Sequence, residues 1–150
     1  MEEHRISKDM RKAGLTLVDG TTIEGQVFLS EYRGHDSGPQ RVGELLEDES
    51  FIPIKLNGEV VLVNVEQIRI VQIESEGEVD NLMTLGVKHS VRISMGDPEA
   101  TISGEIYANA PSPNCRVKDY LNLPNRFIRL IAENRVIYIN RRYVTIVSDL

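Results

Sequence analysis

Apolar and polar residues alternate along several short stretches of the chain, and such alternation predicts β-strands that bury one face. Two expected strands, "LTLVDG" and "TIEGQVFL", come early, and the first ends in an Asp-Gly turn. The second contains a glycine, which in a strand often marks a bend or a close approach of backbone. Three further strands are expected in "FIPIKL", "VVLVN" and "QIRIVQI".

The second half of the chain repeats this pattern in the same order. "TISGEIY" matches "TIEGQVF" 79 residues earlier, and the closing strands reappear as "RFIRLIA", "VIYIN" and "YVTIVS". A short helix is expected before the closing strands of each half, where apolar residues have i, i+3, i+4 spacing: Val42, Leu45 and Leu46, then Val117, Tyr120 and Leu121. The repeated order predicts a duplicated structural unit.

The alignment of the halves also predicts core positions. Phe51-Ile52 aligns with Phe127-Ile128 at an offset of 76, and we expect both apolar pairs to lie in the core. The same offset in the first strand aligns Leu15 with Val91. The halves differ most in the loops before the helices, "SEYRGHDSGPQ" and "ANAPSPNC", so a function that the sequence marks would lie there or among the arginines of the second half.

Each half is therefore expected to form five short strands, with a short helix between strands two and three. Five strands in about 60 residues, with a bent second strand, fit a small barrel better than an open sheet, because closure removes exposed edges. We predict a mostly β protein with short helices, built from two tandem five-stranded barrels. Residues 1–12 would be an extension able to form a short helix, 13–73 the first barrel, 74–86 a linker and 87–150 the second barrel.

Composition and charge narrow the range of partners. The apolar fraction of 41% and charged fraction of 27% are those of a soluble globular protein. No apolar run reaches the roughly 20 residues of a membrane helix, and the charged N-terminus lacks the apolar core of a signal peptide, so we expect a cytoplasmic protein without a membrane partner. A net charge of −6 disfavours non-specific binding of nucleic acid.

The residues that usually bind metals or carry covalent chemistry are sparse. Cys115 is the single cysteine, so the chain can form neither an internal disulfide nor a multi-cysteine zinc site. The three histidines lack ligand spacing, and no glycine-rich segment has the Gly-Lys-Ser/Thr ending of a phosphate loop. We therefore expect no metal, no small-molecule cofactor and no enzymatic activity.

Arginines of the second half are the candidate binding residues. Residues 77–150 carry a net charge of +1, against −7 for residues 1–76. Strand ends and turns could gather these arginines on one face for RNA or an acidic surface, and ordinary solvated charge is the alternative interpretation. They are Arg126, Arg129, Arg141 and Arg142.

A charged pair opens each expected helix. Arg41 precedes Glu44 by three residues, and Arg116 precedes Asp119 by the same spacing, so each pair can meet on one helix face. The pair is either a repeated recognition spot or a structural contact that fixes the helix. Its recurrence in two halves of different net charge favours the structural role.

The segment "LTLVDGTTIEGQV" resembles the first motif of the Sm-like family. An apolar strand is followed by Asp19 and Gly20 in the turn, then by Ile23 two residues before the bending Gly25. This resemblance implies small barrels of the Sm-like or SH3-like type. Proteins of that family typically bind RNA as rings of subunits, through an Asp-x-x-x-Asn element and an arginine-glycine pair. Neither element is recognisable here, so the RNA site is not carried over.

A second resemblance is to small uncharacterised bacterial proteins with an Arg-(Leu/Val)-x-Asp-x-Leu-Asn helix followed by a Phe-(Leu/Ile)-x-Leu strand. The second half keeps the whole pattern, in Arg116, Val117, Asp119, Leu121, Asn122, Phe127, Ile128 and Leu130. In the first half, Glu44 replaces the aspartate and Glu47 the asparagine. That group implies no known activity, so the resemblance bears on the fold alone.

Together with the resemblance to bacterial proteins, these features favour a non-catalytic binding or scaffold module in the bacterial cytoplasm, with a protein partner or self-association into a homo-oligomer. The alternative is an Sm-like RNA-binding protein that uses the arginine-bearing second half, and an enzyme of unknown chemistry comes third.

Overall fold

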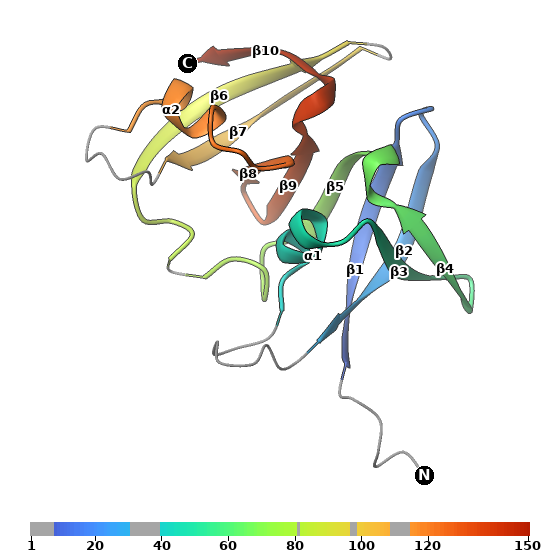
Figure 1. The fold of residues 1–150 in the computed structure, drawn as a ribbon. Helices are drawn as coiled ribbons and strands as arrows, with labels where there is room; N and C mark the ends of the chain where they lie inside the picture. Colours follow the sequence, from blue (N-terminus) through green and yellow to red (C-terminus); the bar gives the residue numbers. More distant parts are fainter. Residues whose placement is uncertain (1–7, 31–39, 81, 97–98, 109–114) are drawn as a thin grey trace.

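The computed structural model describes residues 8–30, 40–80, 82–96, 99–108 and 115–150. These residues form one ten-stranded antiparallel sheet, in the order β10-β6-β7-β8-β9-β5-β1-β2-β3-β4, with two short α-helices (Figure 1). The strands are β1 (Lys8–Leu17), β2 (Thr22–Ser30), β3 (Phe51–Leu56), β4 (Glu59–Asn64), β5 (Ile68–Glu74), β6 (Val87–Met95), β7 (Ala100–Ala108), β8 (Phe127–Ala132), β9 (Arg135–Asn140) and β10 (Val144–Asp149). The helices are α1 (Val42–Asp48) and α2 (Val117–Leu121), and the short 3-10 helices are η2 (Val65–Gln67) and η3 (Arg141–Tyr143).

The two halves of the chain have the same strand order and the same pairing register. In each half the fifth strand pairs with the first, and the order continues through the second, third and fourth. Phe51 pairs with Asn64 between β3 and β4, and Phe127 pairs with Asn140 between β8 and β9. The mostly β fold, with a short helix between the second and third strands of each half, is thus as the sequence predicts.

The prediction of two separate barrels is wrong, because the ten strands form a single sheet that is not closed. A closed barrel would pair the fourth and fifth strands of the same half. Instead β5 pairs with β1 on one side and with β9 of the other half on the other side. This leaves β4 and β10 as the two end strands of the sheet. The alternation of residues within a strand could not predict the pairing of β5 with β9, because alternation does not specify which strand pairs with a given edge.

The N-terminal strand corrects two further expectations. Residues 8–12 are strand instead of helix, because β1 already begins at Lys8, while residues 1–7 lie outside the described part of the chain. Leu15 pairs with Val71, and Ile93 pairs with Val147. The counterpart of Leu15 is therefore Ile93, 78 residues later, and not Val91. The segment between β5 and β6 spans residues 75–86, and the boundaries proposed for the two halves and the linker stay a prediction.

Two hydrophobic cores lie on the two sides of the central strand pair β5–β9. Val136 and Tyr138 point into the core of the first half, whereas Ile137 and Ile139 point into the core of the second half. Ile70 of β5 likewise joins the core of the second half. Both central strands are thus covered on both faces, which explains why β9 is almost continuously apolar.

The glycine in the second strand of each half permits a close approach of the third strand. A Cβ on Gly25 would lie 2.6 Å from Ile54 Cγ2, and a Cβ on Gly104 would lie 2.6 Å from Leu130 Cγ. Since such distances are shorter than atoms allow, only glycine fits there. The same crowding at the same position of both halves supports the duplication.

Candidate functional site

The two halves meet at an interface that we call the joint, made of the β5–β9 pairing and of α1 packed against β8. Five residue pairs make the ladder, from Ile70 opposite Ile139 to Glu74 opposite Arg135. Figure 1 shows α1 lying in front of the central strands, between the two halves. The joint sets the geometry of the features around it.

The C-terminal end of α1 is tied to the start of β8. The Glu47 carboxylate accepts hydrogen bonds from the backbone N–H groups of Arg126, at 2.8 Å, and Phe127, at 3.0 Å. The Arg126 guanidinium donates to the carbonyls of Glu47, at 3.1 Å, and Glu49, at 2.9 Å. A cation at a helix C-terminus is favourable because the last carbonyls carry partial negative charge. Arg126 therefore fixes one half to the other.

The N-terminal end of α1 is held by Glu78, a fully buried carboxylate that the sequence did not point to. Its oxygens accept hydrogen bonds from the backbone N–H groups of Val42 and Gly43, each at 3.1 Å. Arg11 of β1 donates to the same carboxylate at 3.1 Å, as does the hydroxyl of Tyr138 at 2.5 Å. A buried charge needs such partners, so Glu78 has a structural role that links both halves to the segment between them.

Tyr138 fills the space between α1 and β9. A Cβ on Gly43 would lie 2.6 Å from the Tyr138 hydroxyl oxygen, so the helix can sit this close only with glycine at that position. Burial raises the pKa of the Tyr138 hydroxyl well above its usual value, and the negative charge of Glu78 raises it further. The hydroxyl is therefore a hydrogen-bond donor at neutral pH and is unsuited to act as a base.

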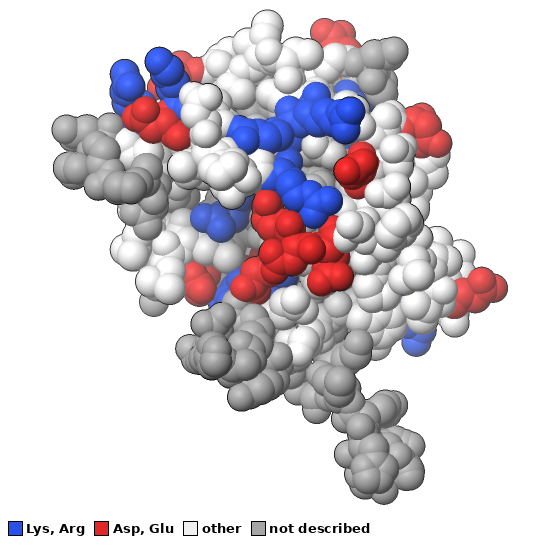
Figure 2. All heavy atoms as spheres, in the orientation of Figure 1, with Lys and Arg blue, Asp and Glu red and all other residues white. Residues whose placement is uncertain are grey.

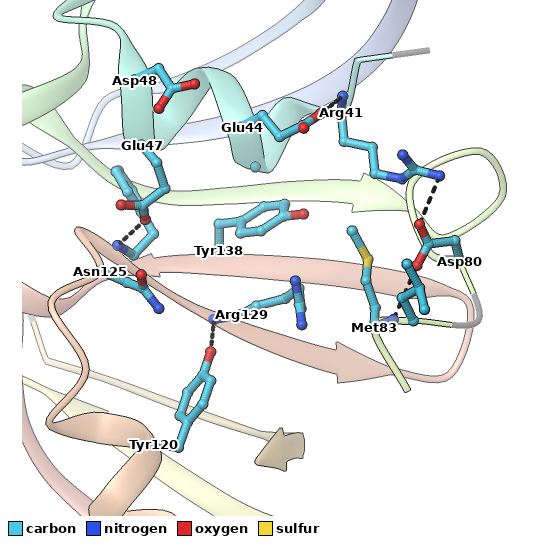
Figure 3. A pocket seen from close by; sticks show the side chains of 13 residues that line it. Arg41, Glu44, Glu47, Asp48, Asp80, Met83, Tyr120, Asn125, Arg129 and Tyr138 are labelled. Carbon is cyan, nitrogen blue, oxygen red and sulfur yellow. Dashed lines mark hydrogen bonds and ion pairs between the residues drawn. The ribbon is translucent and has the colours of Figure 1, made fainter. Parts of the chain in front are cut away.

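A groove of about 610 Å³ runs along the joint, and Figure 3 shows it from close by. Its walls come from α1, from the segment after β5, and from α2 and β8–β9 of the second half. The lining residues are Arg41, Gly43, Glu44, Glu47, Asp48, Asp80, Leu82, Met83, Tyr120, Asn125, Phe127, Arg129 and Tyr138. Both signs of charge line it. Across this face acidic side chains gather around the position of α1, with basic side chains directly above them (Figure 2).

The four candidate arginines do not form one patch. Arg126, Arg141 and Arg142 line a second cavity of about 330 Å³, whereas Arg129 lines the groove at the joint. The Arg141 guanidinium donates to the Leu123 carbonyl, and that of Arg126 is used at the joint. The structure thus brings three of the four arginines together, and two of these already bond backbone carbonyls.

The charged pairs at the two helix starts differ in detail. Glu44 accepts from the backbone N–H of Arg41 at 2.7 Å, while the Arg41 guanidinium reaches Asp80 at 3.1 Å in the segment after β5. In the second half, Asp119 accepts from both the backbone and the guanidinium of Arg116, at 2.9 and 3.2 Å. These hydrogen bonds hold the pKa of Asp119 below its usual range. The contacts are consistent with a helix-fixing role for both pairs.

Large apolar side chains are exposed at the two ends of the sheet. Phe51 is one of them, contrary to the expectation that it lies in the core. Phe51 is 53% exposed at the start of β3, and Val60 and Leu62 of β4 are 59% and 68% exposed. On the other end of the sheet, Ile146 of β10 is 63% exposed. The exposure of these side chains could not be predicted from the sequence, because their strands have the same pattern of apolar residues as the buried strands. The variable loops at 31–39 and 109–114, where we also expected function, lie outside the described residues.

Comparisons with protein-family models, with curated proteins and with solved structures give no match for this chain. In the described residues, no group of three histidine, cysteine, aspartate or glutamate side chains could hold a metal ion. Within the same ranges, no helix combines the length and the apolar character needed to cross a bilayer. The function is therefore argued from the geometry of the joint, the groove and the end strands.

Proposed function

We propose that this protein is a non-catalytic binding module that holds a protein partner along the end strands of its sheet and so acts as a scaffold. The observation that carries the proposal is the row of exposed apolar side chains at the two ends, Phe51, Val60 and Leu62 at one and Ile146 at the other. Soluble proteins rarely expose apolar groups in this way except where something binds them.

The end strands offer the backbone groups and side chains that the addition of a further β-strand requires. An end strand offers a row of backbone N–H and C=O groups to an added strand, and the exposed side chains supply contact area. Proteins that must keep an edge free usually place lysine, proline or a bulge on it. The sequence of β4, EVVLVN, contains neither lysine nor proline, and β10, VTIVSD, also lacks both. The register of β10 against β6 shifts between Val144 and Ile146. The register of β5 against β1 shifts in a comparable way, and β5 still pairs with β9.

RNA binding by the second half is the alternative, and it has less support. Two of the three arginines around the second cavity, Arg126 and Arg141, bond backbone carbonyls of the same chain. Phosphate contacts dominate the affinity for nucleic acid, and guanidinium groups in use elsewhere contribute less to it. The net charge of −6 also opposes such binding.

The proposal is tested by native purification of the tagged chain from its host, with nuclease treatment. We compare wild type with Leu62→Lys and Ile146→Lys, which each place a charge on one end strand. Leu82→Lys is the matched control, because Leu82 is 71% exposed and belongs to the segment between β5 and β6, outside both end strands. Chemical cross-linking followed by mass spectrometry then locates the partner on the chain.

We expect wild type and Leu82→Lys to retain a protein cross-linked to β4 or β10, and at least one end-strand variant to lose it. Equal retention by all four proteins would remove the support for binding along the end strands. A partner that disappears with nuclease treatment, and that depends on Arg141 and Arg142 instead, would favour the RNA alternative.

A further inference from the structure

The joint inside the molecule supplies a specific partner for the end strands. We propose that β10 of one molecule pairs with β4 of a second copy of the same chain, in the register that β5 and β9 use within the molecule. The proposal rests on the proposed function, in that the end strands are taken as the binding surface, and it deepens it by naming the partner. Repetition of the contact links molecules head to tail.

Each exposed apolar residue at the two ends of the sheet has a buried counterpart at the joint. Phe127, Val136 and Tyr138 correspond to Phe51, Val60 and Leu62, and they are 4%, 0% and 4% exposed. Ile70 corresponds to Ile146 and is 6% exposed. The same positions of the repeated unit are thus covered where the neighbouring unit is present and open where it is absent. One contact between two copies would cover Ile146 of one molecule together with Phe51, Val60 and Leu62 of the next.

The pairing register of the joint transfers to β10 and β4 without adjustment. In the joint, Ile70 pairs with Ile139, Val71 with Tyr138, and Ile73 with Val136. The offset of 76 that relates β5 to β10 and β4 to β9 converts these into pairs between molecules. The expected pairs are Ile146 with Val63, Val147 with Leu62, and Asp149 with Val60. Each brings an exposed or half-buried residue of β10 opposite a residue of β4.

Residues that differ between the two halves differ in pairs, and the two changes of a pair compensate each other. Tyr138 needs an acceptor for its buried hydroxyl and needs Gly43 beside it. Its counterpart Leu62 has no hydroxyl and a shorter side chain, so the counterpart of Gly43, Lys118, is not excluded by the same crowding. Asn122 stands at the position of Glu47, and its amide oxygen can likewise accept a hydrogen bond from backbone.

The contact joins two different surfaces, β10 with α2 on one molecule and β3–β4 on the next. Such a heterologous contact leaves one unpaired end on each molecule, so it builds a closed ring when the rotation between molecules closes, and an open filament otherwise. Pairing of β4 with β4, or of β10 with β10, would instead give a two-fold dimer that reproduces no contact of the joint. The two modes are therefore distinguishable by experiment.

One counterpart does not match, and it offers a test by gain of function. Ile73 is buried at the joint, whereas its counterpart Asp149 is an exposed carboxylate that would face Val60 of the next molecule. A charge opposite an apolar residue weakens the contact. We expect Asp149→Ile to lower the dissociation constant of the assembly by about tenfold, because burial of the new side chain adds apolar contact.

The first experiment measures the mass of the purified full chain by light scattering and sedimentation over a range of concentrations. We expect wild type to form species of several times the 16.9 kDa monomer. Leu62→Lys should raise the dissociation constant by about tenfold or more while its circular dichroism stays that of wild type, because a leucine buried on association becomes a charge. Leu82→Lys should assemble like wild type, since it lies outside the contact.

The second experiment tests the register with disulfides in a Cys115→Ser background. Directly opposed residues of antiparallel strands have Cα atoms about 4.5–5.5 Å apart, within the range that a disulfide spans. The double variant Asp149→Cys with Val60→Cys should give a ladder of covalent multimers on oxidation. A mixture of the two single variants should give dimers only. The pair Asp149→Cys with Leu62→Cys is displaced by two residues, about 7–8 Å, and should cross-link poorly.

The outcomes separate this proposal from the proposed function. A wild-type chain that stays monomeric at all concentrations, or single-cysteine variants that each give dimers on their own, would overturn head-to-tail assembly. In the first case, capture of a different protein by the same end strands would leave the proposed function standing. If Leu62→Lys and Ile146→Lys both retain the bound partner and the mass of the wild-type assembly, the proposed function and the head-to-tail assembly are both overturned.

Discussion

Glu78 shows how one side chain can organise an interface between two repeated units. Donors from β1, from the start of α1 and from β9 converge on its carboxylate, which is fully buried. A carboxylate in this position is stabilised by the positive end of the helix and by the Arg11 guanidinium, at the expense of its hydration. The residue lies in the segment between the halves, so the contact forms only when both halves are in place.

Replacing Glu78 with glutamine should destabilise the whole molecule. The change removes the charge opposite Arg11 and places an amide donor against the backbone N–H groups of α1, so we expect a loss of about 3 kcal/mol in the free energy of unfolding. Urea denaturation monitored by circular dichroism measures it. Glu76→Gln is the control, because Glu76 is exposed two residues away, and its midpoint should stay at that of wild type. Equal midpoints for both variants would contradict the role of Glu78.

Tyr138 makes stability depend on alkaline pH. Burial, and next the charge of Glu78, raise the pKa of its hydroxyl above that of an unfolded tyrosine, which is about 10. The folded state therefore keeps a proton that the unfolded state releases, and this contribution is fully present below pH 10 and lost as the pH rises above it. We expect the free energy of unfolding of wild type to fall by up to about 1.4 kcal/mol per pH unit more than that of Tyr138→Phe in this range.

The measurement is a series of urea titrations between pH 8 and about 11, in which only the difference between the two proteins is used. Tyr107→Phe serves as a control, because Tyr107 lies outside the joint on β7. At neutral pH, Tyr138→Phe should be less stable than wild type, since Glu78 loses one donor. Parallel pH profiles for wild type and Tyr138→Phe would show that the hydroxyl ionises equally in both states.

At the scale of elements, strands and helices follow the periodicities from which they were predicted. The short apolar runs "FIPIKL" and "VVLVN" give β3 and β4, and the three-four spacing around Leu45 gives α1. Such patterns are local properties of the sequence, because the spacing of apolar residues within an element determines which of its faces is buried. The helix of seven residues is too short to be stable alone, so its ends depend on Glu78 and Arg126 of other elements.

The glycines in β2 and β7 should resist substitution even by alanine. The Cβ in Gly25→Ala or Gly104→Ala would meet the third strand of its half at 2.6 Å, which forces the strands apart. We expect each variant to lose about 1–3 kcal/mol in the free energy of unfolding, measured by thermal or urea denaturation. In Gly96→Ala the added Cβ would contact Thr145 at an ordinary 3.5 Å, so this variant is a suitable control. A near-neutral Gly104→Ala would indicate that the strands can separate without cost.

At the scale of the whole molecule, one unit is used twice and joined to itself. The cores of the two halves share the central strand pair, so Phe127 of the second half packs in the core of the first. The joint covers the fifth strand of the first half and the fourth strand of the second half, whereas the corresponding strands β10 and β4 lie at the two ends of the sheet. The identical residue type at Phe51 and Phe127 therefore allows the effect of the joint to be measured directly.

Phe127→Ala and Phe51→Ala should differ strongly in a dilute, monomeric solution. Phe127 is buried, so its truncation leaves a cavity and should lower the free energy of unfolding by about 3–5 kcal/mol. Phe51 is more than half exposed, and its truncation should change stability by about 0.5 kcal/mol or less. Urea denaturation at low protein concentration compares the two. Equal losses would mean that Phe51 is covered within the monomer.

The sequence by itself determined the elements, their order and their duplication. Strand and helix periodicity, turn residues and the repeated Gly25 and Gly104 are encoded by neighbours in the chain, so they can be found without the fold. It also pointed to the helix-start pairs and to the candidate arginines, although the structure uses Arg126 and Arg141 to bind backbone carbonyls.

Only the tertiary structure decided how the two units are joined and which apolar strands stay open. The sequences of β4 and β9, EVVLVN and RVIYIN, have the same pattern, yet β9 is covered on both faces and β4 is an end strand. Burial depends on which strand lies beside an edge, and that pairing is a long-range choice that residue spacing does not record. The joint, the role of Glu78 and the exposed apolar side chains at the two ends of the sheet all follow from that choice.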